Sequence, residues 1–485
     1  MLPRPFKIYN TLTNRKDDFV PIVSGKVKFY SCGPTTYDFI HVGNARALVV
    51  GDLIARILRD FGYDVTFARN FTDIDDKIIK AAKENNRDSN EHASIFIEEC
   101  KKDMASLGLI TPQFTPRATE NIKEIITMVQ TLVNNGHAYA FEGEVLFHVP
   151  SNKDYGKLSK KDLESLEHGS RVEVTAHKKH PSDFVLWKPS KEGEPAWESP
   201  WGPGRPGWHI ECSAMAARYL GKTIDIHHGG IDLIFPHHEN EIAQSEGANG
   251  VPFCNYWCHN EFLNFGSEKM SKSLGNVVTI RKFVEVYGGQ ILRQILVAAH
   301  YRTKLDWNDD CISKAMSETE RIHEFVLECK KVSATDEKSE SSIIEGIINV
   351  IEKMRQDLSN DFNTPGALAH FFGLIRDVRR DFLVKGSCPR DVLNAVEKVM
   401  TFVASTLGLV NADPAGILLK LNAIRKAGGA QSKTTSEEVE ALISERALAR
   451  KNKDWASADI VKKKLAQMKI EIKDNPDGTT SWKYL

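Results

Sequence analysis

Polar and apolar residues alternate in two short segments near the N-terminus, residues 26–32 and 64–71, and this alternation predicts a β-strand in each. Residues 43–61 between them have apolar positions at helical spacing and stop before Gly62, which predicts a helix. Strand, helix and strand in this order are typical of the first βαβ unit of a parallel, nucleotide-binding sheet.

The same succession of elements returns further along the chain. Residues 208–220 and 235–243 predict helices, with Pro236 near the first position of the second, and residues 223–228 and 256–259 predict strands. The stretch 136–206 between the two halves contains short strand-like runs, polar loops and turn residues. We therefore expect an α/β fold with a doubly wound, parallel, Rossmann-like nucleotide-binding sheet that is split by an insertion.

Residues after 279 are patterned for helices. Four amphipathic segments predict a helical bundle: residues 313–330, 343–358, 365–382 and 390–407. The polar stretch 426–435, which contains Gly428 and Gly429, predicts a linker to a small C-terminal module. The expected domains are 1–135 (first half of the sheet domain), 136–206 (connective insertion), 207–265 (second half), 266–312 (lysine-containing loop and connection), 313–425 (helical bundle) and 436–485 (C-terminal module).

The charge balance limits the kinds of partner that the chain can have. The formal net charge of the whole chain is −1, so a nucleic-acid surface must be a local patch. Residues 443–485 form such a patch, with ten lysines and arginines against six acidic residues. Eight irregularly spaced cysteines do not make a disulfide framework, and no apolar run is long enough to span a membrane. We expect a cytoplasmic location.

A candidate phosphate site comes from two separated motifs. Lys269-Met-Ser-Lys272-Ser offers two cations and two hydroxyls, which suit a polyphosphate. His41-Val-Gly43-Asn44 stands where the first strand gives way to the helix, so Gly43 lets a phosphate or adenine approach the backbone and the helix N-terminus supplies N–H donors. Neither the G-x-G-x-x-G fingerprint nor a P-loop is present, which excludes a dinucleotide or Walker-type site on sequence grounds.

A candidate metal site rests on residue types rather than on spacing. Cys32, Cys212, His237 and Glu241 suit a soft divalent metal, and the last two share one helix face at i, i+4. The ligands come from three distant segments, so each cysteine is as easily a small buried apolar residue. On composition alone other residues could serve in their place: His209, His227, His228, His238 and Glu239.

These motifs together resemble the signatures of class I aminoacyl-tRNA synthetases, and the whole chain resembles the cysteinyl-tRNA synthetase family. The matching segments are residues 30–35, 41–44, 70–77, 207–213, 228–233, 235–241 and the lysine pentapeptide 269–273. The class I motif ends in histidine where this chain has Asn44, so donation from that position must come from an amide.

The resemblance implies a function for each motif. Activation of L-cysteine with ATP to cysteinyl-adenylate, and its transfer to the 3′ end of cysteine tRNA, would use zinc, one per chain, and Mg²⁺ with ATP. The zinc ligands would be Cys32, Cys212, His237 and Glu241. Cysteine would be bound by Cys32, Thr72 and Trp208, and ATP by His41, Gly43, Asn44, Gly230, Asp232 and Lys272. The catalytic residues would be His41, Asn44, Lys269 and Lys272.

The resemblance also implies tRNA binding. The connection 266–312 would contact the tRNA stem, the bundle would bind tRNA, and the C-terminal module would read the anticodon through Arg446, Arg450, Lys451 and Trp455, with the enzyme expected to be a monomer. Lysines and arginines neutralise phosphates and aromatic side chains stack on unpaired bases. Composition alone would favour a solvated helical face here.

Two other functions fit part of the sequence. A related enzyme class activates cysteine and joins it to an amino sugar, but those relatives lack an anticodon-reading end. A zinc-containing tRNA-binding protein without catalysis would not need the lysine pentapeptide. An ATP–pyrophosphate exchange assay with cysteine and serine separates a ligase from the protein without catalysis, and the C-terminal module argues against the amino-sugar enzyme.

Overall fold

The computed structural model describes residues 3–161, 178–265, 278–431, 436–452, 454–467, 470–474 and 480–484. Its central sheet has the strand order β10-β9-β3-β4, and all neighbouring strands are parallel. The strands are β3 (Lys26–Ser31), β4 (Asp64–Arg69), β9 (Ile224–Gly230) and β10 (Cys254–Asn260). Two strands from each half of the sequence therefore build one sheet, as the predicted split sheet requires.

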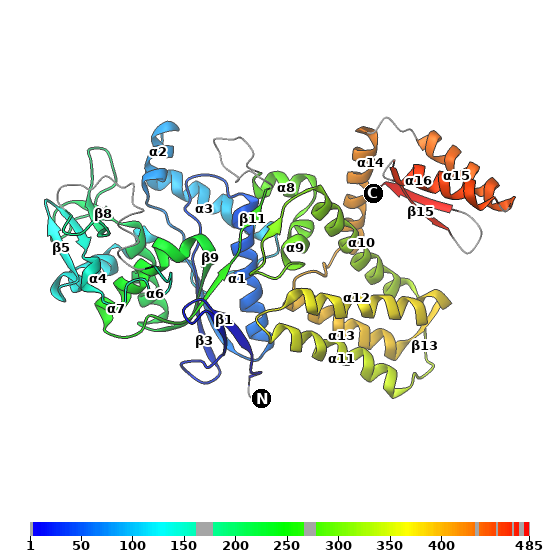
Figure 1. The fold of residues 1–485 in the computed structure, drawn as a ribbon, viewed down its shortest axis with the longest axis horizontal. Helices are drawn as coiled ribbons and strands as arrows, with labels where there is room; N and C mark the ends of the chain where they lie inside the picture. The colour runs from blue at the N-terminus through cyan, green and yellow to red at the C-terminus, as the bar shows by residue number, and fades with distance from the viewer. Residues whose placement is uncertain are drawn as a thin grey trace.

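Helices cover both faces of this sheet, and the alternation along β3 explains how (Figure 1). Val27 and Phe29 pack in the same apolar core as α1 (Val42–Asp60) and α9 (Gly289–Val297). Tyr30 instead packs in a second core with α6 (Trp208–Leu220) and α7 (Glu239–Asn249). Because successive side chains of a strand point to opposite faces, the sheet is doubly wound, as predicted.

The segment between the two halves forms a second, antiparallel sheet. Its strands lie in the order β5-β6-β7-β8: β5 (Ala138–Phe141), β6 (Glu144–Phe147), β7 (Phe184–Pro189) and β8 (Gly204–Pro206). The buried residues of this sheet share a core with α4 (Ile122–Asn134) and with Ile210 and Ala214 of α6. The insertion is thus anchored to the helix that opens the second half of the sheet domain.

The helical region lies beside α1 and α9 (Figure 1). It consists of α10 (Asp309–Lys331), α11 (Ser341–Leu358), α12 (Thr364–Asp381), α13 (Arg390–Thr406) and α14 (Pro414–Gln431). The four predicted amphipathic helices are present within a few residues. The cap of α12 is Asn363, whose side chain accepts a hydrogen bond from the backbone N–H of Gly366.

One predicted boundary is wrong. The stretch 426–435 was expected to be a linker because of Gly428 and Gly429, but α14 continues through both to Gln431. Relative to alanine, two glycines destabilise a helix by about 2 kcal/mol. The preceding turns of α14 and its tertiary contacts outweigh this cost. The connection to the C-terminal module therefore begins after residue 431.

The C-terminal module has a small core of its own. It contains α15 (Ser436–Lys451), α16 (Trp455–Gln467) and the antiparallel pair β15 (Ile470–Asp474) and β16 (Thr480–Tyr484). Its buried apolar side chains form a separate cluster: Val439, Leu442, Ile443, Val461, Leu465 and Ile470. The module lies beside α14, on the side away from the central sheet, and β16 contacts α14 (Figure 1).

The remaining elements are short or lie at the edges of these units. They are β1 (Lys7–Asn10), β2 (Arg15–Asp18), α2 (Asp76–Glu84), α3 (Ser89–Ser106), β11 (Leu263–Asn264), α8 (Ile280–Val286), β12 (Leu305–Asp306), β13 (Ser333–Thr335) and β14 (Ser387–Pro389). Within the described ranges, none of the helices combines the length and the apolar character that crossing a membrane needs.

Candidate active site and metal centre

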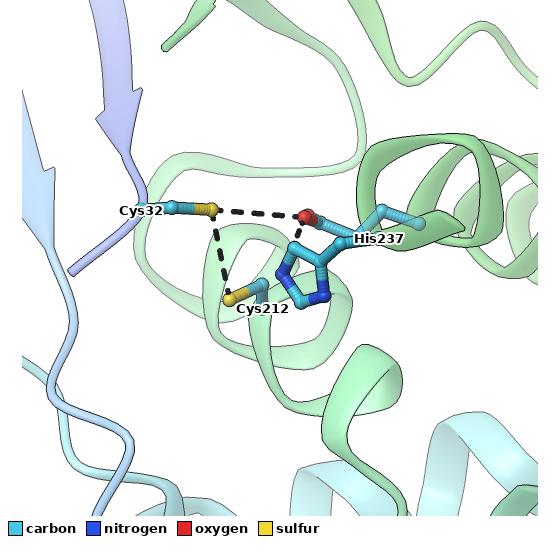
Figure 2. Close-up of side chains that lie close together, drawn as sticks. Cys32, Cys212 and His237 are labelled. Atoms are coloured by element: carbon cyan, nitrogen blue, oxygen red, sulfur yellow. Dashed lines mark hydrogen bonds and ion pairs between the residues drawn. The ribbon is translucent and has the colours of Figure 1, made fainter. Parts of the chain in front are cut away.

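Four of the predicted metal ligands meet at the carboxyl edge of the central sheet. Cys32 follows β3, Cys212 lies on α6, His237 lies on the turn before α7, and Glu241 lies on α7. Their ligand atoms all lie within 4.8 Å of one another, and all four side chains are buried. The Cys32 Sγ lies 4.0 Å from the Cys212 Sγ and 3.7 Å from Glu241 Oε1, which is 3.1 Å from His237 Nε2 (Figure 2). The structure therefore brings together the four residues that the sequence proposed as metal ligands by residue type alone.

The turn that presents His237 differs from the prediction. Residues 234–238 form a π-helical turn in which Phe235 is extended, and the α-helix starts at Glu239 rather than at Pro236. His237 and Glu241 nevertheless face the same way, and the His237 ring stacks on Trp208 with centroids 4.3 Å apart. The irregular turn thus lets one side chain contact both the cluster and the neighbouring helix α6.

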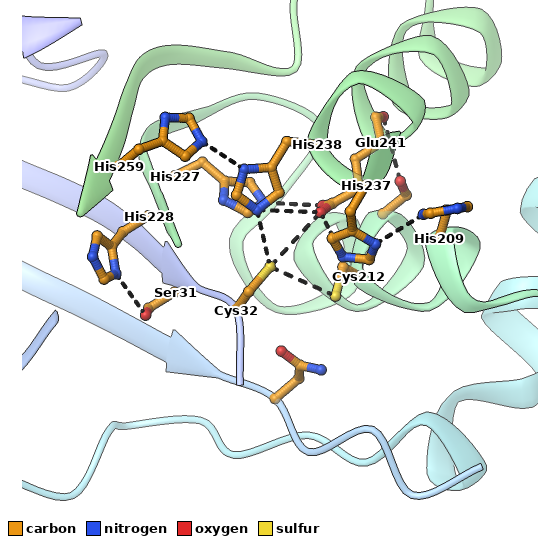
Figure 3. A network of polar contacts seen from close by, with 12 residues as sticks. Ser31, Cys32, His209, Cys212, His227, His228, His237, His238, Glu241 and His259 are labelled. Carbon is orange, nitrogen blue, oxygen red and sulfur yellow. Dashed lines mark hydrogen bonds and ion pairs between the residues drawn. The ribbon is translucent and has the colours of Figure 1, made fainter. Parts of the chain in front are cut away.

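Further histidines surround the cluster (Figure 3). His227 Nε2 lies 2.9 Å from Glu241 Oε2, and His238 Nε2 lies 3.4 Å from the Cys32 Sγ. Cys32, His227, His238 and Glu241 form a second group whose ligand atoms also fall within 4.8 Å. Sequence reasoning named both histidines as alternatives, and the two groups share Cys32 and Glu241. The geometry therefore leaves two possible ligand sets, one with Cys212 and His237 and one with His227 and His238.

Two other candidates have different roles. The Glu239 carboxylate accepts hydrogen bonds from the backbone N–H groups of Gly156, Leu158 and Ser159, so it holds the insertion rather than the cluster. His209 Nδ1 lies 2.9 Å from His237 Nδ1 and orients that ring from behind. Such a partner on the second ring nitrogen is what fixes a ligating histidine in other metal sites.

Sequence reasoning missed His259. Its Nε2 lies 2.8 Å from His238 Nδ1, and its Nδ1 lies 2.7 Å from the Thr11 hydroxyl. A single histidine at the end of an apolar strand gives no periodic signal. Only the parallel pairing of β10 with β9 reveals that it belongs to this network.

The charges of the cluster suit a bound cation. A hydrogen bond from the Cys32 thiol lowers the pKa of Cys212 to about 6, against the effect of burial, while burial raises the pKa of Cys32 well above its usual range. Burial would raise the pKa of Glu241, but His227 and His237 lower it to about 2. The Cys212 thiolate and the Glu241 carboxylate thus share a buried site, and protons on neighbouring groups balance their negative charge. A divalent ion removes that cost and deprotonates the remaining thiol.

The predicted cysteine-binding residues adjoin this cluster. Thr72 follows β4 and is buried; it forms a β-bridge with Thr35, three residues after Cys32, and its carbonyl accepts a hydrogen bond from the backbone N–H of Thr36 at 3.1 Å. Trp208 starts α6 and is 39% exposed, so one side of its ring faces His237 and part of it is open to solvent. Gly207 precedes α6 and has no side chain. This lets the backbone lie close to β7, because an added Cβ would lie 2.1 Å from the Val185 carbonyl oxygen.

The predicted nucleotide-binding residues lie at the same edge of the sheet. His41 caps α1, and its backbone N–H donates to the Asn44 Oδ1 at 3.1 Å, which leaves the amide NH₂ of Asn44 as its donor group. The His41 ring lies against Gly43, where an added Cβ would come within 2.8 Å of it. Gly230 ends β9, and Asp232 follows in an exposed turn.

The lysine motif itself, with Lys269 and Lys272, lies outside the described residues. Val278 and Ile280, which follow the motif in the sequence, form hydrogen bonds with the backbone at the start of α1. The backbone N–H of Val42 donates to the Val278 carbonyl, and that of Ile280 donates to the Ile40 carbonyl, both at 3.0 Å. The chain on the carboxyl side of the lysine motif therefore meets the His41–Asn44 motif directly.

The predicted tRNA-binding residues of the C-terminal module differ in exposure. Arg446 is 9% exposed and donates to both carboxylate oxygens of Asp474, at 2.8 and 3.0 Å. Arg450 also pairs with Asp474, at 2.6 Å, but its side chain is 41% exposed. Trp455 is 61% exposed, and Lys451 is exposed at the end of α15. Arg446 thus joins α15 to β15, and the solvent-facing candidates are the other three.

Known protein families and curated relatives match this chain over most of its length. The family described as the tRNA synthetases class I (C) catalytic domain matches residues 18–317, and the DALR domain family matches residues 353–411. The cysteine--tRNA ligase of Geobacter sulfurreducens is 46% identical over 481 residues, covering 98% of this chain and 99% of that one. The corresponding ligase of Geotalea uraniireducens is 47% identical over 496 residues, with the same coverage.

Two solved structures share the fold at low sequence identity. A Mycobacterium tuberculosis methionyl-tRNA synthetase in complex with methionyl-adenylate is 15% identical, with a TM-score of 0.60, and covers 81% of this chain and 93% of its own. The LeuRS–tRNA–LeuAMS ternary complex of Agrobacterium radiobacter K84 is 12% identical, with a TM-score of 0.59, and covers 84% of this chain and 86% of its own.

Proposed function

Because this chain belongs to the cysteine--tRNA ligase family, we propose that the cluster of Cys32, Cys212, His237 and Glu241 holds one zinc ion, which selects cysteine over serine. The observation that carries the proposal is the buried group of two thiols, an imidazole and a carboxylate within 4.8 Å. Zinc accepts thiolate, imidazole and carboxylate ligands in one site. The similarity to ligases along 98% of the chain disfavours an amino-sugar ligase without the C-terminal module.

Selection needs such an ion because cysteine and serine differ in one atom, and pocket shape discriminates poorly between near-isosteres. When bound, the ion supplies a position for the substrate thiolate that a serine hydroxyl, which stays protonated, fills far less well. The protein's own residues do the rest: His209 and His227 hold the rings and carboxylate of the cluster in place, and Thr72 and Trp208 form the adjoining wall.

The remaining residues act on the nucleotide. The cysteine carboxylate oxygen forms a bond to the α-phosphorus of ATP, and pyrophosphate leaves. The terminal ribose hydroxyl of the tRNA then attacks the carbonyl carbon, and AMP leaves. We assign His41, Asn44, Lys269 and Lys272 to the negative charge that develops in the first step, with Gly43, Gly230 and Asp232 beside the nucleotide and Mg²⁺ accompanying ATP. Positioning and charge neutralisation supply most of the rate in such transfers.

The tRNA would extend from this site along the helical region to the C-terminal module. The connection through residue 312 would contact the stem, the bundle would contact the tRNA body, and Arg450, Lys451 and Trp455 would reach the anticodon loop of cysteine tRNA. Their support is exposure and charge: two cations beside one exposed indole on α15 and α16. A monomer suffices for this arrangement, because each group lies on one chain.

A substitution in the cluster tests the metal assignment. Cys212→Ser should lower bound zinc below one per chain and should reduce the cysteine/serine preference in ATP–pyrophosphate exchange, because the same residue serves both. Cys254→Ser is the matched control: Cys254 is 4% exposed in the same core but lies outside both ligand groups. Unchanged zinc content and unchanged preference in the Cys212 variant would refute the assignment.

A further inference from the structure

Glu211 is a fully buried acidic residue that the mechanism above does not use. It lies on α6 immediately before Cys212 and has 0% exposure. Among the residues that the structure describes, neither of its carboxyl oxygens has a hydrogen-bond partner of acceptable geometry. Buried carboxylates in folded proteins normally have such partners, so an orphaned one indicates a ligand that would supply them.

The helix places this carboxyl in the wall of the cysteine pocket. Trp208, Glu211 and Cys212 stand at i, i+3 and i+4 on α6 and therefore share one face. Trp208 stacks on His237, and Cys212 belongs to the metal cluster. The Thr72 hydroxyl, at the end of β4, interacts favourably with the Glu211 carboxyl. Glu211 thus lies beside Thr72 and on the same face of α6 as Trp208 and Cys212.

The surroundings of Glu211 are acidic. Burial, followed by the nearby Cys212, Asp73 and Asp75, raises the pKa of the Glu211 carboxyl above its usual range, and each of these three neighbours can carry negative charge. Asp73 is itself buried, and its two oxygens already accept hydrogen bonds from the backbone N–H and the hydroxyl of Thr119, at 3.0 and 2.6 Å. Such a pocket is suited to a cation with N–H donors.

We propose that Glu211 is a specificity-determining residue that binds the α-ammonium group of the substrate cysteine, together with the Thr72 hydroxyl. The proposal rests on the proposed function, because it places the substrate thiol at the neighbouring cluster. An amino acid enters this site with one thiol, one carboxylate and one ammonium. The thiol suits the cluster and the carboxylate must face the nucleotide, so the ammonium needs the remaining wall, where Glu211 offers two unused acceptors.

The test compares ligands that differ only in the amino group. 3-Mercaptopropionate has the thiol and the carboxylate of cysteine but no nitrogen. Its inhibition constant in ATP–pyrophosphate exchange, and the KM for cysteine, are measured for the full-length zinc-loaded enzyme and for Glu211→Gln. We expect the KM for cysteine to rise about 10- to 100-fold, as loss of a charge-assisted hydrogen bond predicts, while the inhibition constant changes by less than about threefold.

Two results would overturn the proposal: an unchanged KM for cysteine, or an equal loss of affinity for both ligands, which would mark a purely structural role. If Glu211→Gln does not fold, Thr72→Val is measured in the same way, and it should weaken cysteine binding selectively; equal effects on both ligands would again refute the proposal. Zinc content is determined for each protein. Selective loss of cysteine binding in an enzyme without zinc would keep the Glu211 assignment and overturn the metal assignment instead.

Discussion

Arg46 offers a prediction whose size follows from the structure. Its side chain is 1% exposed on α1, two residues beyond Asn44, and its guanidinium donates to four backbone carbonyls, those of Phe262, His300, Tyr301 and Thr303. Burial lowers its pKa to about 10 and Glu261 opposes that shift, so the side chain stays charged at neutral pH. One cation therefore joins the start of α1 to two separate chain segments.

Arg46→Met keeps most of the apolar volume and removes every donor. Each hydrogen bond is worth about 0.5–1.5 kcal/mol, and each carbonyl left buried without a donor adds to the loss. The four bonds share one guanidinium and two are long, at 3.3 Å, so we expect a total of about 3 kcal/mol. Because Phe262 also lies just before the lysine-containing stretch, adenylate formation should slow as well.

The assay is urea unfolding, followed by single-turnover adenylate formation. Arg59→Met is the matched control: Arg59 is on the same helix but exposed. The control should unfold within about 0.5 kcal/mol of the parent, as surface substitutions usually do. If Arg46→Met unfolds at the same urea concentration as Arg59→Met, the carbonyl contacts do not stabilise the fold as reasoned here.

Two further predictions concern the nucleotide and the tRNA. Lys272→Ala should slow adenylate formation by about 10²-fold or more while leaving cysteine binding nearly unchanged, because the charge acts mainly in the transition state; normal single-turnover kinetics would contradict it. A protein ending at residue 431 should still form cysteinyl-adenylate but lose most tRNA aminoacylation, and its tRNA binding should depend less steeply on salt. Charging of tRNA with undiminished kcat/KM by that shortened protein would rule out an anticodon role for the module.

The sequence predicted regular elements better than their ends. The alternation over residues 26–32 predicted a strand, which the structure confirms. The strand is buried on both faces, because Val27 and Phe29 pack in one core and Tyr30 in another. Gly428 led to the wrong prediction of a linker within α14, and Pro236 led to a predicted start of α7 that is too early. In both cases the local preference of one residue is worth only about 1–3 kcal/mol, less than the packing of a whole helix can supply.

The site was predictable in kind but not in contacts. Residue types nominated Cys32, Cys212, His237 and Glu241, yet Glu239 was an equal candidate until its carboxylate was seen on the backbone of residues 156–159. His259 lies outside the matching segments, and Glu211 lies inside one of them, 207–213, without a predicted role. Their roles arise from pairing of distant strands and from the phase of one helix, which spacing along a chain does not encode.

The order of synthesis gives the cluster a consequence for how the enzyme matures. Cys32 and Glu241 are separated by 209 residues, so at about 5–20 residues per second a ribosome needs about 10–40 s to deliver the last ligand after the first. During most of that interval β3 can pair with β4, but β9 and β10 have not yet been synthesised to complete the sheet. A metal held by this cluster would close loops of 180 and 209 residues, which is where cross-links restrict an unfolded chain most. Metal loading should therefore report that the catalytic half has finished folding, and chelation should release both of these long-range restraints together.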